Sequence, residues 1–454
     1  MESRTIGFKT TELGPLPEEW QVVRLEEVIA KCFSGVWGDS PEELEDEGQV
    51  LVKVIRVSDI KSDSRIAYFK VPLRVVKIKQ LQRYRLKRGD IVVVKSSGSK
   101  SRIISGRSAI FEPPNNVEAF IPSNFTLALR INSQVSDSYF VWYYLLTQRS
   151  KEWVDHVVEG STYPNLKKTE YLMMPIPLPP LPEQRAIAHV LRTVQRAKEA
   201  TERVIAAARE LKKSLMRHLF TYGPVPLDQA DQVPLKETEI GPLPAHWRVV
   251  KLGEVVCKTK HLNPRRHPEW HFKYVDVSCI DNKRLVIMDA KEYTGTNAPS
   301  RARKLVHTGD VIFATVRPYL KRIAMVPPEL DGQICSTAFC ILRATPQRIL
   351  PEYLFYVVTR DAFVEAVSEH QRGSSYPAVT DKDVLQTSIP LPPLSEQKEI
   401  ARLLQTVDRK IQAEEACKQA LEGLFKTLLH NLMTARLRLP QEFVAQFSES
   451  PRRG

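Results

Sequence analysis

The sequence predicts an α+β protein built from two copies of one plan, each a mixed α/β module followed by a long helix. Two observations carry this prediction. The two halves of the 454-residue chain repeat one another, and a heptad-like hydrophobic pattern follows a proline-rich hinge in each half. A chain of this length also exceeds the size of one ordinary hydrophobic core.

The internal repeat recurs in the same order in both halves. TELGPLPEEWQVVRLEEV at 11–28 returns as TEIGPLPAHWRVVKLGEV at 238–255, and GSTYPNLKKTEYLMMPIPLPPLPEQ at 160–184 returns as GSSYPAVTDKDVLQTSIPLPPLSEQ at 373–397. IPSNFTLALR at 121–130 likewise matches ICSTAFCILR at 334–343. The offset shrinks from 227 to 213 residues along the chain, so small insertions in the first half explain it. Duplication predicts a pseudo-twofold relation between the halves.

The repeat and the composition of its parts set the predicted organisation. The β-branched and aromatic runs before each hinge are typical of strands, and proline followed by Glu-Gln suits a helix start. The predicted segments are 1–160 for the first module, 161–222 for the hinge and central helix, 223–246 for the linker and second lead-in, 247–373 for the second module, 374–436 for the second hinge and C-terminal helix, and 437–454 for a tail.

Both long helices are expected to pack against another helix. The first, at about 182–220, has a predicted seam of Val190, Val194, Ala197, Thr201, Val204, Ala208, Leu211 and Leu215. The second, at about 395–436, has apolar residues at the same spacing, interrupted by Glu414 and Lys418. A sustained 3.5-residue period favours an antiparallel coiled-coil pair. The alternative is two amphipathic helices that each lie on their own domain.

The positive charge is concentrated in the two modules. Residues 53–107 hold 16 Lys/Arg against 3 Asp/Glu, and residues 258–322 hold 14 against 6, in a chain of net charge +13. Two basic clusters at corresponding places are the pattern expected of modules that each bind a phosphate backbone. The alternative is that these are ordinary solvated lysines and arginines.

Candidate DNA-binding residues lie mainly in the loop that follows the Gly-Asp turn and the next strand. Basic side chains can pair with guanine edges, and hydroxyls can bond phosphates or bases. The Gly-Ser turns could offer backbone amides to phosphate or be turns only. The candidates are Lys95, Ser97, Lys100 and Arg102 in the first loop, Thr315, Arg317, Tyr319, Lys321 and Arg322 in the second, Arg265 and Arg266 in a further basic segment, and Ser161, Thr162, Ser374 and Ser375 at the two Gly-Ser turns.

The sequence lacks the common motifs of nucleotide and acyl chemistry. It has no Asn/Asp-Pro-Pro-aromatic motif for an adenine methyltransferase, no GxxxxGK[ST] loop and no GxSxG elbow. His267 and His271 are four residues apart, but Pro268 lies between them, so we expect no metal site. The start of the sequence lacks a signal-peptide stretch, no run is long enough for a membrane span, and the 6 cysteines are scattered. We therefore expect a cytoplasmic protein with reduced thiols.

These marks together resemble the specificity subunits of type I restriction-modification systems. The resemblance rests on the paired GPLPxxW lead-ins, the two Pro-Leu-Pro-Pro-Leu-x-Glu-Gln hinges with their long helices, and the Gly-Asp strand frames, and it spans about residues 11–436. It implies two target-recognition domains, at about 20–160 and 247–373, and a chain without catalytic activity. It also implies double-stranded DNA, two methylation subunits and restriction subunits as partners. S-adenosylmethionine, ATP and magnesium would belong to those partners.

The expected function is recognition of a bipartite DNA target, two short half-sites around an unread spacer, on behalf of partner subunits. Two rival interpretations remain open at this point. The chain could be a self-contained restriction or methylation enzyme, or a helical scaffold whose basic lobes bind protein. Sequence-dependent DNA binding would exclude the scaffold, and modification of DNA by the chain alone would establish the enzyme.

Overall fold

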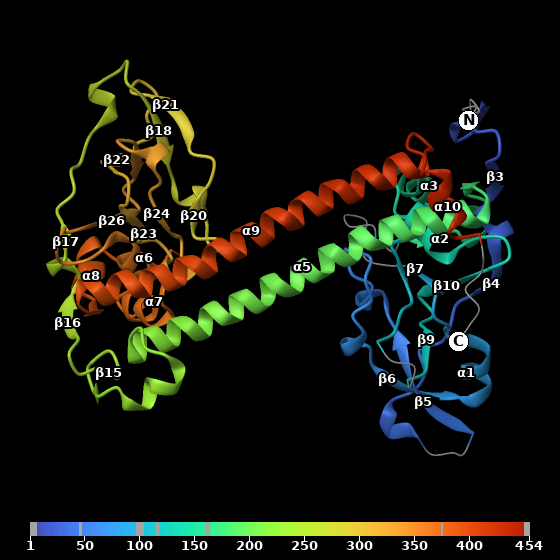
Figure 1. Cartoon of the computed structure of the whole chain (residues 1–454), viewed down its shortest axis with the longest axis horizontal. Helices are drawn as coiled ribbons and strands as arrows, with labels where there is room; N and C mark the ends of the chain where they lie inside the picture. The colour runs from blue at the N-terminus through green and yellow to red at the C-terminus, as the bar shows by residue number, and fades with distance from the viewer. Residues whose placement is uncertain are drawn as a thin grey trace. The chain divides into compact units, whose positions relative to one another are not determined.

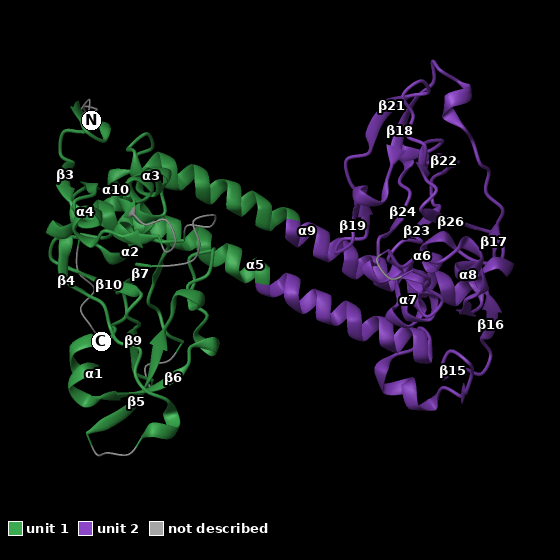
Figure 2. Ribbon diagram, turned by 180° about the vertical axis from the view of Figure 1, so that it is seen from behind, with its two compact units in different colours: residues 1–202, 416–454 green, residues 203–415 purple. Residues whose placement is uncertain are grey.

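The computed structural model describes residues 7–44, 48–96, 104–114, 118–159, 164–373 and 376–448. The chain divides into two compact units, each described by itself below (Figure 2). Unit 1 comprises residues 1–202 and 416–454, and unit 2 comprises residues 203–415. Each unit therefore contains one module together with about half of each long helix, so the compact units cut across the segments read from the sequence.

Unit 1 is built on two small sheets. The first has the strand order β4-β10-β7-β8 and is antiparallel throughout. The second has the order β6-β5-β9, in which β5 and β9 run parallel. Their strands are β4 (Ile29–Phe33), β5 (Gln49–Ile55), β6 (Leu73–Lys77), β7 (Ile91–Val94), β8 (Ser108–Ile110), β9 (Phe120–Pro122) and β10 (Thr126–Ile131). The shorter elements are β1 (Phe8–Thr11), β2 (Gly14–Pro17), β3 (Gln21–Arg24), α1 (Ile78–Tyr84), α2 (Ser138–Leu145), α3 (Gln148–Val157), β11 (Val158–Glu159), β12 (Asn165–Leu166), α4 (Lys168–Leu172) and β13 (Pro175–Leu178).

Unit 2 repeats this topology with one added strand. Its sheet β17-β26-β23-β24 matches the first sheet of unit 1, and its sheet β21-β18-β25-β22 again contains one parallel pair, β18 with β25. These strands are β17 (Val256–Cys257), β18 (His271–Val275), β21 (Lys291–Thr294), β22 (Ala302–Leu305), β23 (Val311–Ala314), β24 (Ile323–Met325), β25 (Ile334–Ser336) and β26 (Phe339–Ala344). The remaining elements are β14 (Leu235–Lys236), β15 (Leu243–Pro244), β16 (Arg248–Lys251), β19 (Ile280–Asp281), β20 (Val286–Ile287), α6 (Pro351–Thr359), α7 (Asp361–Ser368), α8 (Asp381–Gln386) and β27 (Ser388–Leu391). The predicted internal repeat is confirmed.

The central strand of each module is buried on both faces. In β7, Ile91 and Val93 join the core shared with the helices, whereas Val92 and Val94 join the core on the opposite face of the sheet. The strand β23 divides its residues in the same way between two cores. Because successive strand residues face opposite sides, a run of four apolar residues is what such a doubly covered strand requires.

The proline-rich hinges are strands that pair with the lead-ins. β13 pairs antiparallel with β3, and β27 pairs in the same way with β16. Tyrosines from the modules lock the hinges from the other side: the Tyr144 hydroxyl donates to the Pro175 carbonyl at 2.8 Å, and the Tyr353 hydroxyl donates to the Pro390 carbonyl at 2.9 Å. The hinge is therefore a fixed part of each module.

The lead-in tryptophans explain the Glu-Gln that follows each hinge. The indole N–H of the fully buried Trp20 donates to Glu183 at 3.0 Å, and that of Trp247 donates to Glu396 at 2.8 Å. Gln184 donates back to the Pro179 carbonyl at 2.8 Å and accepts from Ser136 at 2.7 Å. A buried indole N–H needs an acceptor, so these bonds fasten the helix start to the module.

The two long helices pair antiparallel within each unit. They are α5 (Leu181–Tyr222, 42 residues) and α9 (Leu394–Met433, 40 residues), followed by the short α10 (Gln441–Ala445) (Figure 1). In unit 1, Lys418 of α9 pairs with Glu202 of α5 at 3.1 Å. In unit 2, Lys212 of α5 pairs with Asp408 of α9 at 2.6 Å. The predicted antiparallel arrangement is therefore seen in both units.

The predicted seam of the first helix is half right. Thr201 and Ala208 are buried as expected, but Val204 is 40% exposed and Leu211 is 57% exposed. The next residue carries the contact in both cases, since Ile205 is buried and Lys212 makes the ion pair with Asp408. The pattern misled because a lysine occupies a seam position and apolar residues occupy the neighbouring solvent-facing positions. No helix in the described part of the chain is both long enough and apolar enough to cross a membrane.

Candidate nucleic-acid interface

The Gly-Asp turn builds the frame that carries the candidate loop in each module. Gly89 and Gly309 have φ values of +89° and +84°, which favour glycine. The following carboxylate is buried and takes two hydrogen bonds from an arginine of the neighbouring strand. Arg130 donates to Asp90 at 2.9 and 2.7 Å, and Arg343 donates to Asp310 at 2.8 and 2.7 Å. The pair ties the start of the central strand to the strand beside it.

The first candidate loop begins against the Gly-Ser turn region. The Lys95 carbonyl accepts from the Leu166 N–H at 2.8 Å, and Ser96 forms a bridge with Asn165. Lys95 itself is half-buried. The candidates Ser97, Lys100, Arg102, Ser161 and Thr162 lie outside the described residues, as do Ser374 and Ser375 in the second module.

The second candidate loop lies against the corresponding segment of unit 2. The Thr315 carbonyl accepts from the Val379 N–H at 2.9 Å, and the Arg317 N–H donates to the Pro377 carbonyl at 2.8 Å. In both modules, residues about 60 to 70 positions apart in sequence are thus brought together. Thr315 is buried, with its hydroxyl donating to the Ala338 carbonyl at 2.9 Å, so its contribution is to the loop's backbone shape.

Two left-handed residues fix the shape of this second loop. Arg317 has φ 50° and Lys321 has φ 51°, and they flank a short 3₁₀ turn, Pro318–Leu320. Left-handed conformations are costly for residues other than glycine and persist only where the surroundings impose them. The turn presents Tyr319 with 51% of its surface exposed. This loop is therefore pre-organised.

Two basic candidates in this loop are engaged inside the module. The Lys321 ammonium donates to the Thr359 carbonyl at 3.2 Å and to the Asp361 carboxylate. The Arg322 guanidinium donates to the Val277 carbonyl at 2.7 Å. Long-range partners hold both side chains, so direct contact with DNA would require these bonds to be shared or broken. They remain predictions.

The other basic candidates of unit 2 lie on a separate segment. Arg265 and Arg266 belong to the 3₁₀ turn Pro264–Arg266, where Arg265 donates to the Ala298 carbonyl at 2.9 Å and Arg266 is exposed. Among the described residues, no hydrogen bond or ion pair joins this turn to the loop at 315–322. The two sets are therefore independent parts of the module's surface.

The sequence reading missed one aromatic residue and miscounted one charge. Tyr376 is 72% exposed, and the Arg317 guanidinium lies over its ring, 4.8 Å from the centroid. Its place in the repeated Gly-Ser-x-Tyr-Pro motif is the signal that could have identified it. Lys304, counted in the basic cluster, is only 4% exposed and binds the Phe339 carbonyl at 2.7 Å and Asp381 at 2.5 Å. That charge is internal.

The described residues show no arrangement for metal or thiol chemistry. No group of three or more His, Cys, Asp or Glu residues within them is placed to hold a metal ion. Burial raises the pKa of the Cys335 thiol to about 12 and also raises that of Cys340, so neither is a reactive thiolate.

Two topologically equivalent modules, each with a basic segment and a loop framed by a buried ion pair, define the class of tandem-module nucleic-acid binding proteins. The model of the type I restriction modification DNA specificity domain matches this chain twice, at residues 17–208 and 244–423. The chain belongs to this family: it is a type I restriction-modification specificity subunit, and its function is sequence-specific DNA recognition.

Curated relatives and a solved structure agree with this assignment. The type I restriction enzyme MjaVIII specificity subunit of Methanocaldococcus jannaschii is 23% identical over 447 residues, covering 95% of this chain and 96% of the relative. The EcoKI specificity subunit of Escherichia coli K12 is 24% identical, covering 86% and 82%. A type I restriction-modification S subunit from M. genitalium has the same fold, with a TM-score of 0.57 at 16% identity over 91% of this chain and 96% of that one.

Proposed function

We propose that this chain reads a bipartite DNA target, one half-site per module, and brings partner subunits to it without chemistry of its own. The observation that carries the proposal is the contrast between frame and loop. The Gly-Asp ion pairs Asp90–Arg130 and Asp310–Arg343 are equivalent, whereas the loops that follow them, 95–102 and 315–322, differ in nearly every residue. Equal frames with different loops suit two readers of different sequences.

The partners follow from the same proposal. Two methylation subunits would carry S-adenosylmethionine, and restriction subunits would carry the nuclease and the ATP- and magnesium-dependent translocation, all acting on DNA in the cytoplasm. In this arrangement the long helices set the spacer. At 1.5 Å per residue, the 42 residues of α5 extend about 63 Å, well beyond the roughly 34 Å of one DNA turn.

The test is a methylation map. The chain is expressed with its methylation subunit in a host lacking N6-methyladenine, and modified sites are located by sequencing. The expected result is one bipartite motif. A second map is made after residues 247–373 are replaced by the same segment of another family member. One half-site should change and the other should stay. Methylation without a bipartite motif, or a simultaneous change in both half-sites, would contradict the proposal.

A further inference from the structure

Each module touches the long helices at a second place, far from the hinge. The first attachment is the Trp–Glu bond at the helix start, at Glu183 in unit 1 and Glu396 in unit 2. The second is an ion pair at Glu202 in unit 1 and Glu415 in unit 2, in each case 19 residues farther along the helix. The duplication has kept this spacing in both halves.

In unit 1 the second attachment comes from the tip of a tight turn closed by the bridge between Ile60 and Ile66. Ser64, at the tip, has a left-handed φ of 61°. The next residue, Arg65, binds one oxygen of Glu202 at 2.9 Å, and Lys418 of α9 binds the other at 3.1 Å. Asp63 holds the same guanidinium from behind at 2.8 Å.

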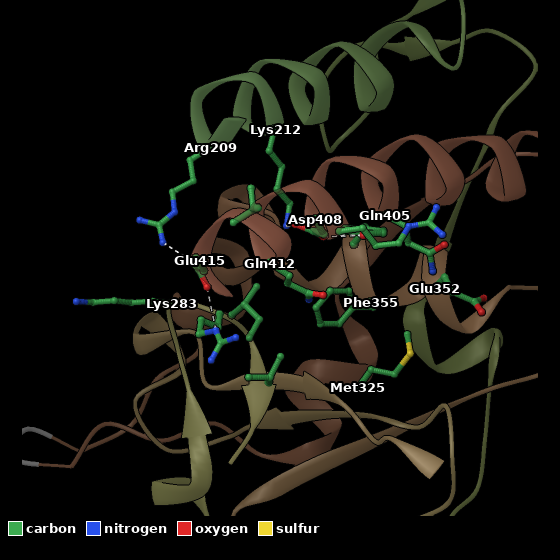
Figure 3. A pocket seen from close by; sticks show the side chains of 16 residues that line it. Arg209, Lys212, Lys283, Met325, Glu352, Phe355, Gln405, Asp408, Gln412 and Glu415 are labelled. Atoms are coloured by element: carbon green, nitrogen blue, oxygen red, sulfur yellow. Dashed lines mark hydrogen bonds and ion pairs between the residues drawn. The ribbon is translucent and has the colours of Figure 1, made fainter. Parts of the chain in front are cut away.

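In unit 2 the hairpin β19–β20 occupies the corresponding place, with a left-handed Leu285 (φ 56°) at its tip. Arg284 binds one oxygen of Glu415 at 3.2 Å, and Arg209 of α5 binds the other at 2.7 Å. Figure 3 shows this carboxylate between the two cations, at the wall of a cavity of about 520 Å³. Each glutamate thus joins three elements: the module hairpin, its own helix and the other long helix.

The distance between the two attachments decides what the second one can do. Nineteen residues of helix span about 28 Å, so the hairpin contact lies far from the hinge. A module held only at the hinge could pivot. A rotation of about 5° would move a point about 28 Å away by about 2.5 Å, enough to break an ion pair. The hairpin contact therefore limits rotation of the module on the helices to a few degrees.

We propose that Arg65 and Arg284 are positioning residues that fix the angle of each recognition module on the long helices, and through it the length of the DNA spacer. The inference rests on the proposed bipartite function. One base pair more or less in the spacer moves a half-site by about 3.4 Å and turns it by about 35°. A locked module cannot follow that change, whereas an unlocked module can follow part of it.

The competing explanation is that these arginines bind DNA phosphate. Arg65 and Arg284 are 42% and 39% exposed in their side chains, so phosphate contact is sterically open to them. The two explanations predict different data. A phosphate contact adds equally to binding of every DNA and steepens the salt dependence, whereas a positioning contact changes only the preference among spacer lengths.

The experiment compares Arg284→Met with Lys283→Met in the full chain, assembled with its methylation subunits. Lys283 is the matched control, because it lies on the same hairpin, points away from Glu415 and makes no ion pair within the described residues (Figure 3). Affinity is measured for the cognate site and for sites with one spacer base pair added or removed, at several salt concentrations. Hydrogen exchange of residues 280–287 is followed without DNA.

For Arg284→Met we expect the preference for the cognate spacer to fall about two- to five-fold, with cognate affinity kept and faster exchange in the hairpin. Arg284→Lys should retain most of the preference, and Lys283→Met should retain all of it. A uniform loss on all three sites with a shallower salt slope would overturn the proposal in favour of phosphate binding. An unchanged spacer preference would also overturn it. If the wild-type complex itself showed no bipartite preference, the proposed function would fail first.

Discussion

Asp310→Asn tests whether the buried carboxylate after the Gly-Asp turn supports unit 2. The side chain is 2% exposed, takes two bonds from Arg343 and accepts the His307 N–H at 2.8 Å. The amide keeps the size of the carboxylate but cannot pair with a guanidinium at both positions. Breaking a buried ion pair costs about 3–5 kcal/mol, and we expect the lower end because the Arg343 side chain is 27% exposed and can turn to water.

A loss of about 3 kcal/mol lowers the Tm of a unit of this size by about 6–12 °C. Differential scanning calorimetry of the full chain measures it, with Asp90→Asn as the matched change in unit 1. The double variant Asp310→Asn, Arg343→Met checks the cause. If the ion pair carries the effect, adding the second substitution should cost less than Arg343→Met costs alone. A Tm within 1 °C of the parent for Asp310→Asn, or strictly additive losses in the double variant, would refute this reasoning.

Three further predictions concern the hinges, the helix pair and the loop. Tyr353→Phe and Tyr144→Phe should each lower the free energy of unfolding by about 1 kcal/mol, measured by urea titration, because each leaves a buried hinge carbonyl without its donor. Burial alone would raise the pKa of Glu202, but Lys418 and Arg65 outweigh it and hold that pKa below its ordinary value, so its contribution to stability is present above the ordinary glutamate pKa and lost as pH falls through the lowered one. Glu202→Gln should flatten the pH dependence of unfolding below about pH 4.5, and an unchanged curve would count against it. Arg317→Ala should relax only the half-site read by unit 2 in the methylation map, and an equal effect on both half-sites would contradict modular reading.

The frame of the fold could be predicted because its determinants are local and repeated. The hinge proline and the Glu-Gln pair place the start of the first helix at about 182, and the structure begins α5 at Leu181. The seam could be predicted only in part. An ion-paired lysine, Lys212, takes a seam position, whereas Leu211 beside it faces outward, and hydrophobicity alone assigns these two residues the other way.

The candidate interface could be predicted less well, because partners distant in sequence decide it. The sequence shows Lys321 and Arg322 as two cations in a loop. That Asp361 and Val277 hold them depends on how α7 and the turn before β19 pack beside the loop. The exposed Tyr376 escaped notice for the same reason, since its ring gains meaning only once Arg317, 59 residues earlier, is placed over it.

Differences between the equivalent helix contacts specify which helices pair. In unit 1 the Tyr143 hydroxyl donates to Gln195 of α5 at 3.3 Å and its ring packs on Phe425 of α9. In unit 2 the equivalent Tyr356 donates to Asp408 of α9 at 2.7 Å, and Lys212 of α5 takes the place of the phenylalanine.

Duplicated helices could otherwise pair with their own kind between two copies of the chain. In the same register, α9 against α9 would set Asp408 against Phe425, an unpaired carboxylate on an aromatic ring. The pairing of α5 with α5 would set Lys212 against Gln195, with no carboxylate to receive it. A partly buried charge without a partner is costly, so both exchanged pairings are disfavoured. The divergence of these positions after duplication thus favours pairing of α5 with α9, which is the arrangement that holds each module on both long helices.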